Sequence, residues 1–139
     1  MPRVLVADPI AAEGVELLGS GADVDVKHGL KPAELLEVIS SYDALVVRSE
    51  TKVTPEVVEA AKNLMVIARA GIGVDNINLE AATNAGIAVV NAPIGNTVAA
   101  AEHTVALMLA LARNVPQAVQ SVKQGEWRRS AFMGIEVRN

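Results

Sequence analysis

The residue types best suited to chemistry lie in one short stretch of this chain. An apolar run leads into Arg69, and two glycines, Gly71 and Gly73, follow with a single residue between them. Glycine has no Cβ, so both positions can adopt backbone angles closed to other residues and let a ligand approach the N–H groups of Ile72 and Gly73. The guanidinium of Arg69 adds a permanent cation whose parallel N–H groups match a carboxylate. The stretch therefore predicts a binding site for a small anion. Asp75 is expected to stabilise the loop by accepting hydrogen bonds from backbone N–H groups.

Two other interpretations of the glycine pair remain open. The pair begins like the dinucleotide-binding pattern G-x-G-x-x-G, but Asn76 stands where the third glycine belongs. The next helix is predicted to begin only at Asn78, and about 20 residues further on, near Ala92 and Pro93, there is no acid that could bind a ribose hydroxyl. The remaining alternative is purely structural, a turn between strand and helix whose glycines only permit a tight bend.

Composition limits the classes of protein to which the chain can belong. With 139 residues, of which 51% are hydrophobic and 20% charged, the chain can bury a sizeable core, and only 2% is aromatic. The net charge of −4 argues against nucleic acid or an anionic membrane as the main partner. The chain has no apolar run of bilayer length, no signal-peptide pattern and no cysteine, which favours the cytoplasm. No metal site is predicted.

Strand and helix signals alternate along the first ninety residues. Apolar runs predict strands, and turn residues, N-caps and first-turn prolines bound the helices between them. The strands are expected at 3–7, 23–26, 44–47, 65–68 and 87–90, and the helices at 13–18, 32–39, from 55 and from 78. This alternation predicts an α/β fold with a parallel sheet covered by helices on both faces. Ligands collect at the carboxyl ends of such strands, where Asp8, Arg48, Arg69 and Asn91 emerge.

The character of the sequence changes after Asn91. A segment with a proline, Asn91 to Asn96, predicts a hinge, and Thr97 to Arg113 predicts a helix that is apolar nearly all round. A shorter helix, Pro116 to Lys123, and a basic turn, Gly125 to Arg129, follow. We therefore expect one domain at residues 1–94 and the start of a second at 95–139. Because little else in the chain could bury the long helix, we expect a piece of a larger protein.

Several motifs in one order resemble those of the D-isomer-specific 2-hydroxyacid dehydrogenase family, and most closely those of its members that act on a phosphorylated acid. The matching segments are Arg48-Ser49, Arg69 to Asn76, Asn91 to Thr97, Ala101 to His103 and Gly125 to Gly134. The resemblance covers essentially the whole chain. It implies a flavodoxin-like substrate-binding domain, then a hinge and the opening helices of a Rossmann domain that binds NAD.

The resemblance also implies roles for individual residues. The backbone of Gly71 to Gly73 would hold the substrate carboxylate with Arg69 beside it, and Arg48 would face the phosphate end. Asn96 would lie near both the substrate and the nicotinamide. Arg129 would reach toward a partner subunit's active site, because these enzymes pair through their nucleotide domains. A homo-oligomer that binds a small phosphorylated 2-hydroxy acid is therefore expected.

The family's cofactor-binding motif and catalytic residues are not found among these 139 residues. The family's nucleotide-binding G-x-G-x-x-G loop, its ribose-reading acid and its catalytic Arg, Glu and His have no counterpart, and His28 and His103 are expected to be structural. No catalytic residue is assigned, and the chain alone is expected to be inactive. Two functions remain open. The chain is either the substrate-recognition portion of an NAD-dependent dehydrogenase or a non-catalytic ligand-sensing or protein-binding module of the same fold.

Overall fold

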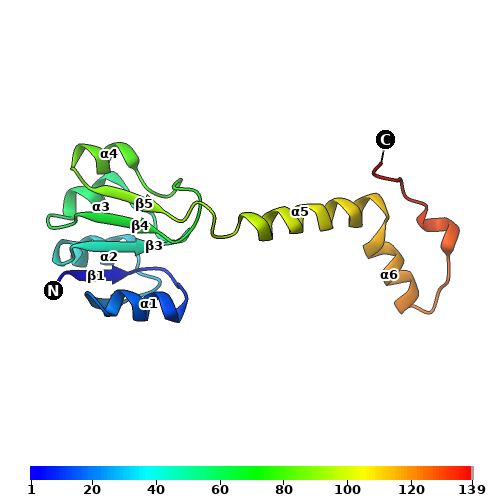
Figure 1. Ribbon diagram of the computed structural model, residues 1–139, viewed down its shortest axis with the longest axis horizontal. Helices are drawn as coiled ribbons and strands as arrows, with labels where there is room; N and C mark the ends of the chain where they lie inside the picture. Colours follow the sequence, from blue (N-terminus) through cyan, green and yellow to red (C-terminus); the bar gives the residue numbers. More distant parts are fainter. Residues whose placement is uncertain (139) are drawn as a thin grey trace. The chain divides into compact units, whose positions relative to one another are not determined.

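The computed structural model describes residues 1–138 and divides into two compact units, Met1–Gly95 and Asn96–Asn139 (Figure 1). The first unit contains one sheet of five parallel strands in the order β2-β1-β3-β4-β5. The strands are β1 (Arg3–Val6), β2 (Asp23–Val26), β3 (Ala44–Val47), β4 (Val66–Arg69) and β5 (Ala88–Asn91). This order is the flavodoxin-like one, so the predicted α/β class and parallel sheet are confirmed.

Two strands lie one residue further along the chain than predicted. β4 ends at Arg69 and β5 ends at Asn91, whereas both residues were expected just beyond their strands. In the parallel register Val47 pairs with Arg69, and Arg69 pairs with Asn91. Arg69 is therefore fixed by main-chain pairing on both sides, because it belongs to the sheet and not to the loop that follows.

The helices of the first unit form where caps and prolines predicted them. They are α1 (Ala12–Gly19), α2 (Pro32–Val38), α3 (Pro55–Ala60) and α4 (Leu79–Asn84), with a 3-10 turn η1 (Ile39–Ser41) after α2. The Asn78 side chain accepts a hydrogen bond from the Ala81 N–H at 2.8 Å, and Gly86 follows α4 with φ of +72°. Thr54 occupies the N-cap position of α3, but its side chain makes no capping hydrogen bond in the described structure.

Alternate residues of the strands feed two hydrophobic clusters, one on each face of the sheet. The larger cluster packs β-strand residues such as Leu5, Leu45 and Ile67, all fully buried, against α2, α3 and α4. The smaller one packs Val6 and Val46 near α1. The prediction of helices on both faces is confirmed, and most of the core lies on the face that α2, α3 and α4 cover.

The second unit consists of α5 (Thr97–Ala112), α6 (Val115–Lys123) and a 3-10 turn η2 (Arg129–Phe132). Asn114 adopts the left-handed conformation with φ of 52° and turns the chain between α5 and α6. No residue of α5 is buried, although the helix is as apolar as its sequence predicted. Among residues 1–138, no helix combines the length and the apolar composition needed to cross a membrane.

Candidate functional site

The side chain of Arg69 is largely covered and is held from one side. Only 12% of it is exposed, and its Nε donates a hydrogen bond to Oδ1 of Asn76 at 3.0 Å. Its Nη2 lies 3.9 Å from Oδ1 of Asp75, whose side chain is 87% exposed, so this ion pair is weak. Asp75 accepts no backbone hydrogen bond from the described residues, and its predicted bracing role is therefore wrong. The two Nη groups of Arg69 are directed toward the loop, and the exposed Asp75 is the only acid within ion-pair distance of them among the described residues.

Gly71 and Gly73 are needed for a reason other than backbone conformation. Neither has a positive φ, so the expectation that they use angles closed to other residues is wrong. A Cβ on Gly71 would lie 2.5 Å from Nη1 of Arg69, and one on Gly73 would lie 2.9 Å from Oδ1 of Asp75. The side chains of Arg69 and Asp75 therefore cross the loop backbone in the space that glycine leaves empty.

The N–H groups of this loop are only partly used by the protein. The Gly71 N–H donates to the carbonyl of Arg69 at 2.8 Å. Within residues 1–138, the N–H groups of Ile72 and Gly73 have no hydrogen-bond acceptor. The loop itself is tied to β5, since Nδ2 of Asn91 donates to the Ile72 carbonyl at 2.6 Å. Two donors beside a guanidinium thus form an arrangement that can bind an anion.

Arg48 follows β3 directly and lies in the strand-end segment next to Arg69. Its side chain is exposed, and its Nη1 donates to the carbonyl of Pro9 at 3.3 Å. It forms no ion pair with Glu50 or with any other acid of the described chain. A second guanidinium therefore lies at the same edge of the sheet and has no ion-pair partner among the described residues.

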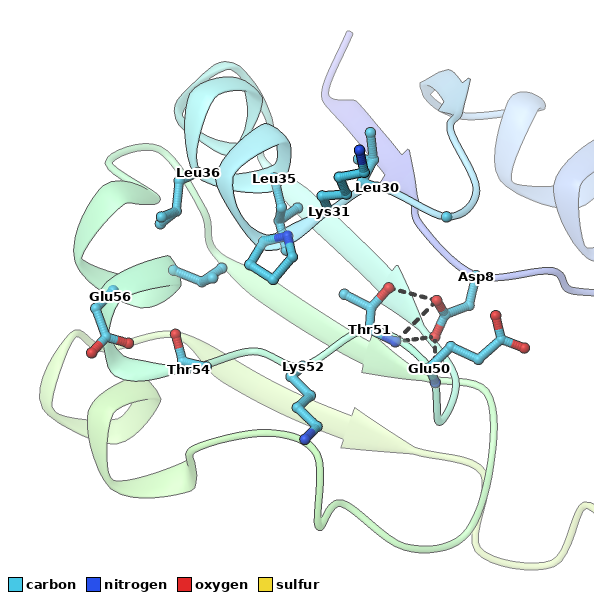
Figure 2. Close-up of a pocket in the computed structure, with 13 residues that line it drawn as sticks. Asp8, Leu30, Lys31, Leu35, Leu36, Glu50, Thr51, Lys52, Thr54 and Glu56 are labelled. Carbon is cyan, nitrogen blue, oxygen red and sulfur yellow. Dashed lines mark hydrogen bonds between the residues drawn. The ribbon is translucent and has the colours of Figure 1, made fainter.

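Asp8 holds the segment that carries Arg48. It is 1% exposed, and its carboxylate accepts the N–H groups of Arg48 at 2.6 Å, Glu50 at 3.3 Å and Thr51 at 3.1 Å, together with the Thr51 hydroxyl at 2.5 Å. Burial alone would raise the pKa of Asp8, but the hydrogen bonds from Thr51, Arg48 and Glu50 lower that pKa below its ordinary value. Figure 2 shows the converging bonds from Thr51 and Glu50.

Asn76 is the residue that sequence reasoning missed. Its Oδ1 accepts from Arg69, while its Nδ2 donates to the carbonyls of Arg48 at 2.8 Å and Thr51 at 2.6 Å. From the sequence, Asn76 is the residue that breaks the G-x-G-x-x-G pattern and the last residue of the motif that begins at Arg69, and no linking role was predicted for it. The available signal was that an amide carries both a donor and an acceptor and can therefore link two neighbouring segments.

A cavity of about 530 Å³ lies beside the segment held by Asp8 (Figure 2). Its wall is mostly aliphatic, and the residues Leu30, Pro32, Leu35, Leu36 and Val57 supply that part of it. Asp8 and Thr51 belong to the same wall, so the cavity and the Arg48 segment share a boundary.

Asn96 and Arg129, the other two predicted site residues, lie in the second unit. Asn96 is exposed at the start of α5, where its carbonyl accepts the Ala100 N–H at 2.9 Å and its side chain makes no capping hydrogen bond in the described structure. Arg129 begins η2 and lines a shallow depression together with Trp127 and Arg128.

The family model for the D-isomer specific 2-hydroxyacid dehydrogenase catalytic domain matches residues 4–130 of the chain. The chain belongs to the D-isomer-specific 2-hydroxyacid dehydrogenase family. The resemblance inferred from the motifs is thereby confirmed, and the family is one of oxidoreductases.

Members of this family with curated functions are closely similar to the chain. It is 56% identical to the D-3-phosphoglycerate dehydrogenase of Archaeoglobus fulgidus over 98% of its own length, and 52% identical to that of Synechocystis over 99%. It covers 26% and 25% of those two proteins, and it corresponds to their N-terminal part. The chain thus spans about a quarter of the length of these 2-hydroxyacid dehydrogenases.

Solved structures of other proteins share the fold of this chain. A Thermus thermophilus protein matches 99% of the chain with a TM-score of 0.86 and 35% identity, and the match covers 46% of that protein. The NAD+-bound 3-phosphoglycerate dehydrogenase of Entamoeba histolytica matches 81% of the chain with a TM-score of 0.71 and 30% identity, over 39% of its own length.

Proposed function

We propose that the chain is the substrate-recognition portion of an NAD-dependent dehydrogenase that oxidises 3-phospho-D-glycerate to 3-phosphohydroxypyruvate. The observation that carries the proposal is the arrangement at the end of β4. There, the guanidinium of Arg69 lies beside the N–H groups of Ile72 and Gly73, which have no acceptor in the described structure. The similarity to D-3-phosphoglycerate dehydrogenases supports the choice of substrate.

In this proposal the two ends of the substrate bind to two different strand ends. The carboxylate accepts from Ile72, Gly73 and Arg69, and the phosphate lies against Arg48, which follows the register partner of Arg69 in β3. Binding both ends fixes the orientation of C2 between them. That positioning lowers the entropic part of the barrier for the oxidation of the 2-hydroxyl.

In the intact enzyme, NAD would accept the hydride that leaves C2. Among the described residues, only Asn96 is proposed to contact it, since its side-chain amide is exposed and makes no capping bond. The 139 residues contain no G-x-G-x-x-G pattern, so the main cofactor contacts lie outside this sequence. We therefore expect no NADH formation by this chain alone, measured as absorbance with 3-phosphoglycerate and NAD.

The second unit is proposed to belong to the nucleotide-binding domain of the intact enzyme, with residues 1–94 as the substrate-binding domain. Arg129 is proposed to reach a partner subunit's site in a homo-oligomer. Its exposed position in a basic turn is compatible with that role. A cytoplasmic location is proposed on the composition and the absence of cysteine.

Titration calorimetry with 3-phosphoglycerate tests the proposal. The wild-type chain is expected to bind, and Arg69→Ala and Arg48→Ala are each expected to weaken binding about tenfold or more, since each removes one cation. Lys62→Ala is the matched control, because it removes an exposed cation from the loop between α3 and β4. Equal affinity in all four proteins would contradict the proposed site. Absence of binding by the folded wild type would favour the non-catalytic module.

A further inference from the structure

The side-chain amide of Asn76 connects the two cations of the candidate site. Its oxygen holds Nε of Arg69, and its two N–H groups hold the carbonyls of Arg48 and Thr51. Every hydrogen-bonding position of the amide nitrogen is used, and the oxygen is directed to the guanidinium. No other described residue bonds both to the Arg69 side chain and to the Arg48 segment.

The main chain of Asn76 is fixed without help from this amide. Its carbonyl accepts the Val53 N–H at 2.8 Å, and the Asn78 N–H donates to the Val53 carbonyl at 2.9 Å. Val53 and Ile77 form a parallel bridge between these two short segments, and both side chains are buried. Loss of the Asn76 side chain is therefore expected to leave the local fold in place.

The Arg48 segment is held from two opposite directions. Asp8 accepts the N–H groups of Arg48 and Thr51, while Asn76 donates to the carbonyls of the same two residues. The carboxylate of Asp8 stays ionised at neutral pH because the hydrogen bonds to it hold its pKa below the ordinary value. The main-chain N–H and carbonyl of Arg48, and those of Thr51, are thus all bound by side chains.

We propose that Asn76 is a positioning residue that joins the Arg69 guanidinium and the Arg48–Thr51 main chain into one unit, and that this unit makes the site selective for ligands with two anionic groups over ligands with one. The inference rests on the proposed function. A ligand with one anionic group can bind to one of the two arginines alone. A ligand with an anionic group at each end binds tightly only if the distance between Arg48 and Arg69 is fixed. A fixed distance between Arg48 and Arg69 therefore raises the affinity for a ligand with two anionic groups more than the affinity for a ligand with one.

The hydrogen bond from Arg69 is measured directly by nuclear magnetic resonance of its Nε–Hε group. In the wild type this proton is expected to exchange slowly with solvent, and in Asn76→Ala its exchange is expected to accelerate about tenfold or more. Asn63→Ala is the matched control, because Nδ2 of Asn63 also donates to a carbonyl, that of Ser40, at 2.8 Å. Unchanged exchange in Asn76→Ala would overturn the positioning role.

Selectivity is measured by the affinities for 3-phosphoglycerate and D-glycerate. Asn76→Ala is expected to weaken binding of 3-phosphoglycerate about tenfold and binding of D-glycerate less than about threefold. In an Arg69→Ala background the loss for 3-phosphoglycerate is expected to fall below about threefold, because the two residues act as a unit. Equal losses for both ligands, or additive losses, would overturn the inference. If the wild type binds neither ligand, the proposed function and the claimed selectivity both fail, and the Arg69 exchange rate alone decides the positioning role.

Discussion

The guanidinium of Arg69 crosses the backbone of Gly71 so closely that a Cβ on Gly71 would lie 2.5 Å from Nη1. Because Nη1 is the far end of a flexible side chain, a larger residue at position 71 can be accommodated by moving the arginine. The fold does not require Gly71 through its backbone conformation, since its φ is not positive. The glycine therefore serves the placement of the cation.

Gly71→Ala is accordingly expected to reduce anion binding more than stability. The added methyl group displaces the guanidinium from the loop, and binding of 3-phosphoglycerate should weaken about tenfold. The free energy of unfolding should change by about 1 kcal/mol or less, because no backbone strain is introduced. Calorimetry and urea unfolding measure the two quantities separately.

Gly21→Ala is the control for this substitution, because nothing lies within 4 Å of a Cβ built there. It should change neither affinity nor stability appreciably. A Gly71→Ala protein that binds as tightly as the wild type would show that the position of Arg69 is irrelevant to binding.

Arg69→Lys should fail to restore the site despite keeping the charge. Lysine has no planar fork, so it cannot donate to Asn76 and also present two parallel N–H groups to a carboxylate. Affinity for 3-phosphoglycerate should fall about fivefold or more relative to the wild type. Affinity equal to that of the wild type, measured at the same ionic strength, would mean that a point charge is sufficient.

Much of the fold could be predicted from the sequence because the patterns that indicate strands and helix ends involve residues close together in the chain. The alternation of apolar runs with capped helices, such as the one that Asn78 begins and Gly86 ends, predicts the parallel α/β sheet. The ends of β4 and β5 lie one residue later than predicted because main-chain pairing, which sets them, involves neighbours distant in sequence. Arg69 is a strand residue for this reason.

Only part of the candidate site could be predicted from the sequence. Placement of Arg48 and Arg69 at one edge follows from the parallel direction of β3 and β4, which the alternation of strands and helices predicts. The linking role of Asn76 could not be predicted, because its partners lie 25 and 28 residues away and depend on how the loops fold back. The reason for Gly71 was also missed, since it depends on the rotamer of a neighbouring arginine.

Asp8→Asn should destabilise the first unit at neutral pH. The buried carboxylate accepts bonds from Thr51 and two further N–H groups, and an amide nitrogen in its place would face donors without an acceptor. The expected loss is about 2 kcal/mol or more in the free energy of unfolding. Asp75→Asn, at a side chain that is 87% exposed, should have almost no effect.

The same residue gives the stability a pH dependence of known sign. The pKa of Asp8 in the folded protein lies below the 3.8 of an ordinary aspartate, so folding favours the ionised form. Its contribution is fully present above the pKa of the unfolded chain and is lost as the pH falls through the folded pKa. The stability difference between wild type and Asp8→Asn should therefore be constant from about pH 5 to 7 and shrink below about pH 4. A difference that grows on acidification would contradict this account.

The exposed apolar surface of α5 should make the chain self-associate. Val98, Leu107 and Leu111 are 70%, 57% and 80% exposed, and exposed apolar side chains on several sides of one helix are typical of a segment that packs against a partner. Sedimentation velocity should show association that rises with concentration and decreases in Leu107→Glu/Leu111→Glu. Leu17→Glu, a substitution at a residue of α1 that is 75% exposed, is the control. A monomer at high concentration would contradict the prediction.

The N–H groups of Ile72 and Gly73, together with Arg69, are proposed to bind the carboxylate of a small metabolite. Titration of the labelled chain with 3-phosphoglycerate, followed by nitrogen–proton correlation spectra, measures these N–H groups individually. We expect saturable downfield shifts of the Ile72 and Gly73 amide protons in the wild type and no such shifts in Arg69→Ala. Ile72 and Gly73 signals that remain unmoved at saturating ligand, or that shift equally in Arg69→Ala, would contradict the proposal.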